Sequence, residues 1–112
     1  MVRWKLSELS QRKELFEVLG NSGNMQVATM CLKKGETSGE YGTDHPQSDQ
    51  LVFVLAGLGE AKVGGDNHEL WPGDLILIEA GEEHQIRGKS EELFQTVNFY
   101  SPMAYPDEAK DF

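Results

Sequence analysis

Two histidines stand where an apolar strand meets a loop, and their side chains could bind a metal ion. His84 closes residues 73–84, in which an apolar stretch ends in a glycine turn. His45 precedes the apolar run of residues 51–57. Imidazoles suit Fe, Mn, Ni, Cu or Zn, and the amide oxygen of Gln50 could be a third, neutral ligand. The sequence therefore predicts a pocket that both histidines share.

The alternation of residue types around His84 predicts that its side chain points into the fold. Successive side chains of a strand point to opposite faces. The flanking charged and amide side chains suit water, so His84 and Ile86 are expected to point inward. The segment around His45 offers no such test. The alternatives are an ordinary exposed loop position for His45 and a hydrogen-bonded position at the pocket mouth for His84.

A nearby carboxylate would strengthen this site, because an amide offers less charge to a divalent ion than a carboxylate does. Asp44 precedes His45 directly, and Glu40 lies in the same loop. The candidate metal ligands are therefore His45, Gln50, His84 and Asp44. The choice of Asp44 or Glu40 as the acidic partner stays open.

Glycine and proline divide the chain into short apolar segments, which is typical of an all-β protein. There are 12 glycines and four prolines. No segment is long enough for a helical crossover between parallel strands, which favours a sandwich or a barrel. The expected strands are residues 15–19, 25–32, 51–56, 60–63, 68–70, 75–78, 84–87 and 93–100.

The chain is expected to form one domain with a short extension at each end. Its 112 residues can bury one core. Residues 1–14 are expected to be an irregular or briefly helical lead-in, and residues 15–102 the barrel. Residues 103–112 form a tail without periodicity that is expected to pack loosely outside or to fray. The polar residues 33–42 are expected to be a loop at the barrel mouth.

Charge and motif content exclude several functions. The net charge of −9 opposes binding to nucleic acid and to anionic membrane surfaces. The single cysteine, Cys31, lies in an apolar run and is expected to be a core residue. No signal-peptide core or apolar span of roughly 20 residues occurs, so we expect a cytoplasmic protein. The chain has no nucleophile elbow, phosphate-binding glycine loop or zinc-finger spacing.

The first histidine segment resembles the first sequence motif of the cupins. Within residues 35–57, His45 stands where the second motif histidine is expected, and Gly57 stands at the closing glycine. Gln50 replaces the motif glutamate, and Thr43 replaces the first motif histidine. The resemblance to this motif is therefore partial.

The second segment, residues 73–88, resembles the second cupin motif more closely. The positions in register are Gly73, Gly81 and His84, while Glu79 and Gly88 replace the usual proline and asparagine. The resemblance covers about residues 15–102 and implies a double-stranded β-helix, the jelly-roll barrel. The chain is similar to small single-domain cupins of the cupin-2 type, such as the mannose-6-phosphate isomerase-like cupins.

The resemblance also implies a function. In a similar cupin subgroup an acidic residue, this histidine, the glutamine and the second-motif histidine surround a metal. One hypothesis is a metal-dependent oxygenase or isomerase that takes a small polar molecule, such as a sugar or a keto acid. The other is a metal-free cupin that binds a small ligand as a sensor or storage domain. Cupin sheets also pair at their edges, so a homodimer is expected through the hairpin at residues 15–32.

Overall fold

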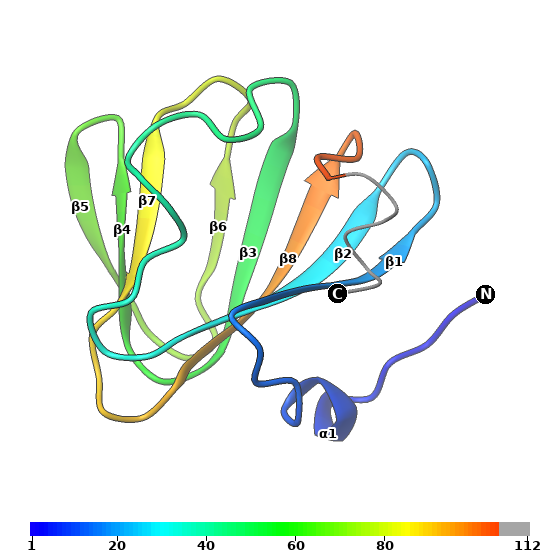
Figure 1. The fold of residues 1–112 in the computed structure, drawn as a ribbon, viewed down its shortest axis with the longest axis horizontal. Helices are drawn as coiled ribbons and strands as arrows, with labels where there is room; N and C mark the ends of the chain where they lie inside the picture. Colours follow the sequence, from blue (N-terminus) through cyan, green and yellow to red (C-terminus); the bar gives the residue numbers. More distant parts are fainter. Residues whose placement is uncertain (106–112) are drawn as a thin grey trace.

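The computed structural model describes residues 1–105, and most of its regular structure is β-sheet (Figure 1). The elements are α1 (Leu6–Leu9), β1 (Phe16–Asn21), β2 (Gln26–Leu32), β3 (Asp49–Ala56), β4 (Gly59–Val63), β5 (Asp66–Leu70), β6 (Leu75–Ile78), β7 (His84–Gly88) and β8 (Phe94–Ser101). Each expected strand is present, with ends displaced by two residues or fewer. The all-β prediction is therefore confirmed.

Two antiparallel sheets face each other and enclose the core (Figure 1). The larger sheet has the strand order β1-β2-β8-β3-β6, and the smaller sheet has the order β5-β4-β7. The chain leaves the larger sheet after β3, returns for β6, and crosses again for β7 and β8. This exchange of strands between two sheets is the wiring of a jelly roll.

In β3 and β7 the buried side chains alternate with more exposed ones, as the period of a strand requires. In β7, His84 and Ile86 are buried and Arg87 is exposed, which confirms the predicted inward face. The main core cluster joins both sheets and consists of Met30, Leu32, Val52, Val54, Ala61, Leu70, Ile78, Ile86 and Phe94. The pocket described below lies beside this cluster.

The loop expected at the barrel mouth runs along β7 before it reaches the pocket. Single bridges join Lys34 to Gly88 and Gly42 to His84. The bridge between Lys34 and Gly88 requires a glycine at position 88, because a Cβ there would lie 2.5 Å from the Lys33 carbonyl oxygen. The loop therefore covers the free edge of β7 and fixes the backbone of His84.

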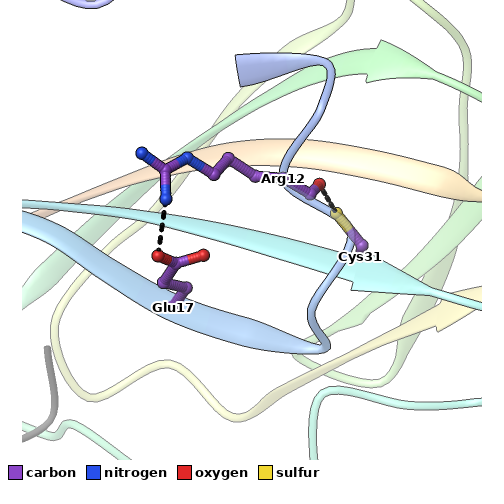
Figure 2. A network of polar contacts seen from close by, with 3 residues as sticks. All are labelled: Arg12, Glu17 and Cys31. Carbon is purple, nitrogen blue, oxygen red and sulfur yellow. Dashed lines mark hydrogen bonds and ion pairs between the residues drawn. The ribbon is translucent and has the colours of Figure 1, made fainter. Parts of the chain in front are cut away.

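The N-terminal lead-in is held against β1 and β2. The Arg12 guanidinium donates a hydrogen bond of 2.8 Å to Glu17, and the Cys31 thiol donates one of 3.0 Å to the Arg12 carbonyl oxygen (Figure 2). Burial raises the pKa of the Cys31 thiol. Cys31 is therefore a buried structural residue, as predicted. Within residues 1–105 no helix is both long and apolar enough to span a membrane.

The prediction that the tail packs loosely outside the barrel or frays is wrong for Tyr105. Tyr105 does not lie outside the barrel, because its ring packs 4.8 Å from the Phe16 ring and 5.3 Å from the Tyr100 ring. The Gln26 side chain donates a hydrogen bond of 2.8 Å to the Tyr105 carbonyl and accepts one of 3.0 Å from its N–H. Residues 106–112, to which the same prediction applied, lie outside the described residues.

Candidate functional site

A cavity of about 250 Å³ opens between the sheets where the two predicted histidines meet. Its polar side chains come from the loop before β3, from β3, β7 and β8, and from the chain after β8. The lining residues are Leu15, Phe16, Met30, Ser38, Asp44, His45, Gln50, His84, Tyr100 and Tyr105. The cavity therefore brings together all four predicted site residues and has room for a small molecule.

His45 is buried, so the alternative of an exposed loop residue is wrong. It begins a tight turn in which the Ser48 N–H donates to the His45 carbonyl oxygen over 3.0 Å. The His45 Nδ1 lies 3.2 Å from the Ser48 carbonyl oxygen, and the Nε2 lies 2.8 Å from Gln50 Oε1. The turn thus points the Nε2 of His45 at the side-chain amide of Gln50, the second residue of β3.

His84 is the first residue of β7, and its backbone is fixed on both sides. Its N–H donates to the Gly42 carbonyl over 2.9 Å, and its carbonyl accepts from the Gly42 N–H over 3.2 Å. The ring Nδ1 lies 3.0 Å from the Glu82 carbonyl oxygen, which can only accept. A neutral His84 ring with its proton on Nδ1 leaves Nε2 free to coordinate. The His45 and His84 ring centroids are 4.8 Å apart.

The contacts of His45 fit a bound cation. Both atoms that face its ring nitrogens are acceptors, the Ser48 carbonyl oxygen and Gln50 Oε1, and a neutral imidazole has one N–H. If Nδ1 carries that proton, the Nε2 lone pair faces the amide oxygen at 2.8 Å. Two lone pairs at this distance repel each other unless a proton lies between them or both atoms bind the same metal ion. The donor set of two imidazoles and one amide oxygen therefore fits a metal ion.

The acidic candidates take different places. Asp44 lines the cavity but is exposed, whereas Glu40 is exposed and does not line it. Within residues 1–105, no group of three His, Cys, Asp or Glu side chains is arranged to hold a metal ion. Asp44 therefore does not complete a set with the two histidines in this geometry, and Gln50 is the remaining candidate for a third donor.

Two tyrosines that sequence reasoning missed complete the cavity. The Tyr100 hydroxyl accepts a hydrogen bond of 3.3 Å from Gln50 Nε2, and its ring stands edge-on to His45 at 5.0 Å. Burial raises the pKa of Tyr100 well above 10.0, and burial also raises the pKa of Tyr105. Both side chains are therefore neutral phenols at neutral pH. Nearly every residue of β8 is buried, so no alternation marks Tyr100, and Tyr105 follows the last strand and carries no periodic signal either.

The fold and the site together define a class of protein, a jelly-roll barrel with a histidine-bearing pocket between its sheets. Residues 28–100 match the family described as "Cupin domain", which is more than half of the chain. The chain belongs to the cupin family. The predicted double-stranded β-helix is confirmed.

Similar proteins are found among curated sequences and solved structures. The chain is 36% identical over 64 residues to L-ectoine synthase of Saccharopolyspora erythraea, which covers 55% of this chain and 46% of that protein. The BH2720 protein of Bacillus halodurans is 26% identical, with a TM-score of 0.82 over 89% of this chain and 79% of that one. A double-stranded β-helix protein of Klebsiella pneumoniae is 20% identical, with a TM-score of 0.75 over 89% of both chains. The chain thus matches less than half the length of the curated relative.

Proposed function

We propose that this chain is a cupin that binds one divalent metal ion through His45, Gln50 and His84, with a small polar molecule beside it. The observation that carries the proposal is that buried His45 has an acceptor oxygen at each ring nitrogen: the Ser48 carbonyl oxygen lies 3.2 Å from Nδ1, and Gln50 Oε1 lies 2.8 Å from Nε2. Backbone carbonyls face the Nδ1 atoms of both histidines, which is the usual outer support of metal-binding imidazoles. Fe, Mn, Ni, Cu and Zn all accept this donor set.

The spacing of the two rings supports the same proposal. Metal to imidazole bonds are about 2.1 Å long, so two imidazoles bound at roughly 90–110° hold their ring centroids roughly 4.6–5.3 Å apart. The centroids of His45 and His84 are 4.8 Å apart. The two rings therefore need no large movement to share one ion.

The lining of the cavity narrows the substrate class. Asp44 is the charged side chain of the lining, and no lysine or arginine contributes to it within residues 1–105. A phosphorylated substrate would meet a carboxylate and no basic side chain. The cavity of about 250 Å³ therefore suits a small neutral polar compound with a carbonyl or hydroxyl group, such as an unphosphorylated sugar.

In this proposal a metal ion and two neutral tyrosine side chains would act on the bound molecule in different ways. A bound divalent ion supplies Lewis-acid polarisation of a carbonyl or hydroxyl oxygen. The Tyr100 and Tyr105 hydroxyls stay protonated and can donate hydrogen bonds to a polar molecule, while Phe16 and Met30 exclude water from one wall. This division suits an isomerase or an oxygenase, and the match to a protein named L-ectoine synthase favours an enzyme.

A metal-free cupin that binds a small ligand is the second candidate. The specific observation in its favour is the neutral third donor, since the described residues offer no set of three ionisable ligands. In that case His45, Gln50, His84 and the tyrosines would act as hydrogen-bonding groups in a sensor or storage protein.

Elemental analysis of untagged protein separates the two candidates. We expect about one equivalent of metal per chain in the wild type and loss of that metal in His45→Ala and His84→Ala. His68→Ala is the matched control, because His68 is exposed on β5 and should keep the metal. Circular dichroism shows whether each variant is folded. Wild-type protein that stays metal-free after incubation with these ions would contradict the metal site and leave the ligand-binding barrel.

A further inference from the structure

A chain of buried polar side chains leads from the backbone of β2 to the candidate site. The Thr96 hydroxyl donates a hydrogen bond of 2.8 Å to the Met30 carbonyl oxygen. Asn98 Nδ2 donates one of 2.9 Å to the Thr96 hydroxyl oxygen, and Gln50 Nε2 donates one of 2.8 Å to Asn98 Oδ1. Thr96 and Asn98 are fully buried, and Gln50 is 3% exposed. These side chains form a continuous polar path inside the barrel.

The Met30 carbonyl gives this path a direction. A carbonyl oxygen can only accept, so the Thr96 hydroxyl must point its hydrogen toward Met30 and offer its oxygen to Asn98. Asn98 therefore turns its NH₂ group toward Thr96 and its oxygen toward Gln50. Gln50 in turn presents its NH₂ group to Asn98, which leaves Oε1 facing His45 at 2.8 Å.

The register of the sheet keeps this path in place. Thr96 pairs with Met30 across β2 and β8, and Gln50 pairs with Tyr100 across β3 and β8. Tyr100 supplies a second acceptor for the Gln50 NH₂ group. Buried polar groups cost stability unless each of them has a hydrogen-bond partner. An apolar residue at position 98 would need no such partner. The presence of buried polar groups beside Gln50 points to a role in the site.

We propose that Thr96 and Asn98 are positioning residues that fix the Gln50 amide with its oxygen toward the two histidines. This inference rests on the proposed metal site. Reversal of the amide would place an NH₂ group where the metal is bound and would remove the third ligand. The polarity of the path thus presents an oxygen at this point, which is the atom of the amide that can bind a cation.

The test compares Thr96→Val, which removes the hydroxyl at nearly constant shape, with Thr96→Ser, which keeps it. Metal affinity is measured by chelator competition with Zn²⁺, and stability by urea unfolding. Loss of a direct partner of a metal ligand costs about 10- to 100-fold in affinity. Thr96 acts on Gln50 through Asn98, so we expect Thr96→Val to weaken Zn²⁺ binding by about 10-fold, the lower end of this range, and Thr96→Ser to remain close to the wild type. Folded Thr96→Val protein with wild-type affinity would overturn the inference.

A second measurement needs no metal, and its wild-type part needs no variant. In the metal-free wild type, NMR should show the Gln50 NH₂ protons near the Tyr100 ring rather than near the His45 ring. In Thr96→Val, contacts to the His45 ring should appear as the amide gains its second orientation. Wild-type NH₂ protons that already contact His45 would overturn the inference, even if Thr96→Val does not fold. A wild type that binds no Zn²⁺ but shows the Tyr100 contact would refute the metal site and leave the positioning of Gln50 supported.

Discussion

At the residue scale, Tyr100 links the chemistry of the pocket to the stability of the fold. Burial raises the pKa of its phenol well above 10.0, so the folded chain holds this proton at pH values where the unfolded chain releases it. Stability from this group is therefore complete below about pH 10 and decreases above it, at most by about 1.4 kcal/mol per pH unit. Urea unfolding between pH 8 and 11 should show this decrease in the wild type.

The matching variant is Tyr100→Phe, in which the alkaline decrease should be smaller. It should also be somewhat less stable at pH 8, because Gln50 Nε2 loses one acceptor. Tyr41→Phe, on the loop before β3, is the control and should follow the wild type. Parallel curves for Tyr100→Phe and the wild type above pH 10 would contradict the assignment.

Individual site residues were predictable to different degrees. The position of His84 could be predicted because it lies in a strand with clear alternation. His45 precedes a strand, so its burial depends on the turn to Ser48, which no periodic pattern encodes. The place of Gln50 depends on Asn98, which is 48 residues distant in sequence. Asp44 was expected among the ligands because it is next to His45; it lines the cavity without forming a group of three with the two histidines, and its place as a ligand stays a prediction.

At the element scale, close backbone contacts make particular glycines necessary. A Cβ on Gly88 would lie 2.5 Å from the Lys33 carbonyl oxygen and 2.8 Å from the Leu32 carbonyl oxygen, and backbone atoms cannot move aside as flexible side chains do. We expect Gly88→Ala to lower the free energy of unfolding by about 1–3 kcal/mol. Denaturant titration measures this change.

Gly42→Ala is the control for this prediction. Gly42 also belongs to the loop along β7, but a Cβ there would meet no atom within 4 Å. Its stability should stay within about 0.5 kcal/mol of the wild type. Equal stability of the Gly88 and Gly42 variants would show that the loop adjusts its path without cost.

Strand positions were predicted well because glycine, proline and turn residues mark where extended segments must end. Pairing was not predicted, because β8 lies between β2 and β3 and its partners are far from it in sequence. A strand with two buried neighbours can be recognised from its composition, but the identity of its neighbours depends on the complete fold. The loop at residues 33–42 was likewise expected at the mouth, and its run along β7 was visible only in the structure.

At the scale of the whole molecule, the candidate site joins the two sheets. Gln50 belongs to β3 of the larger sheet and His45 to the loop before it, whereas His84 begins β7 of the smaller sheet. A ligand held by all three would therefore connect the two sheets inside the barrel, in addition to the backbone hydrogen bonds between Gly42 and His84 and the packing of the core. The homodimer through the β1–β2 hairpin stays a prediction, and the charge of −9 per chain would oppose it most at low salt.

The position of the candidate site between the two sheets predicts that metal binding stabilises the whole fold. An ion bound to the native pocket has no equivalent site in the unfolded chain. At a free metal concentration 100 times the dissociation constant, the gain is about 2.7 kcal/mol. Thermal unfolding with Mn²⁺ or Zn²⁺, followed by EDTA, should show a reversible rise in Tm for the wild type and for His68→Ala. The rise should be absent in His84→Ala, which leaves ligands on one sheet alone. An equal rise in His84→Ala would mean that the ions bind the acidic surface instead, and that the two sheets are not joined through this pocket.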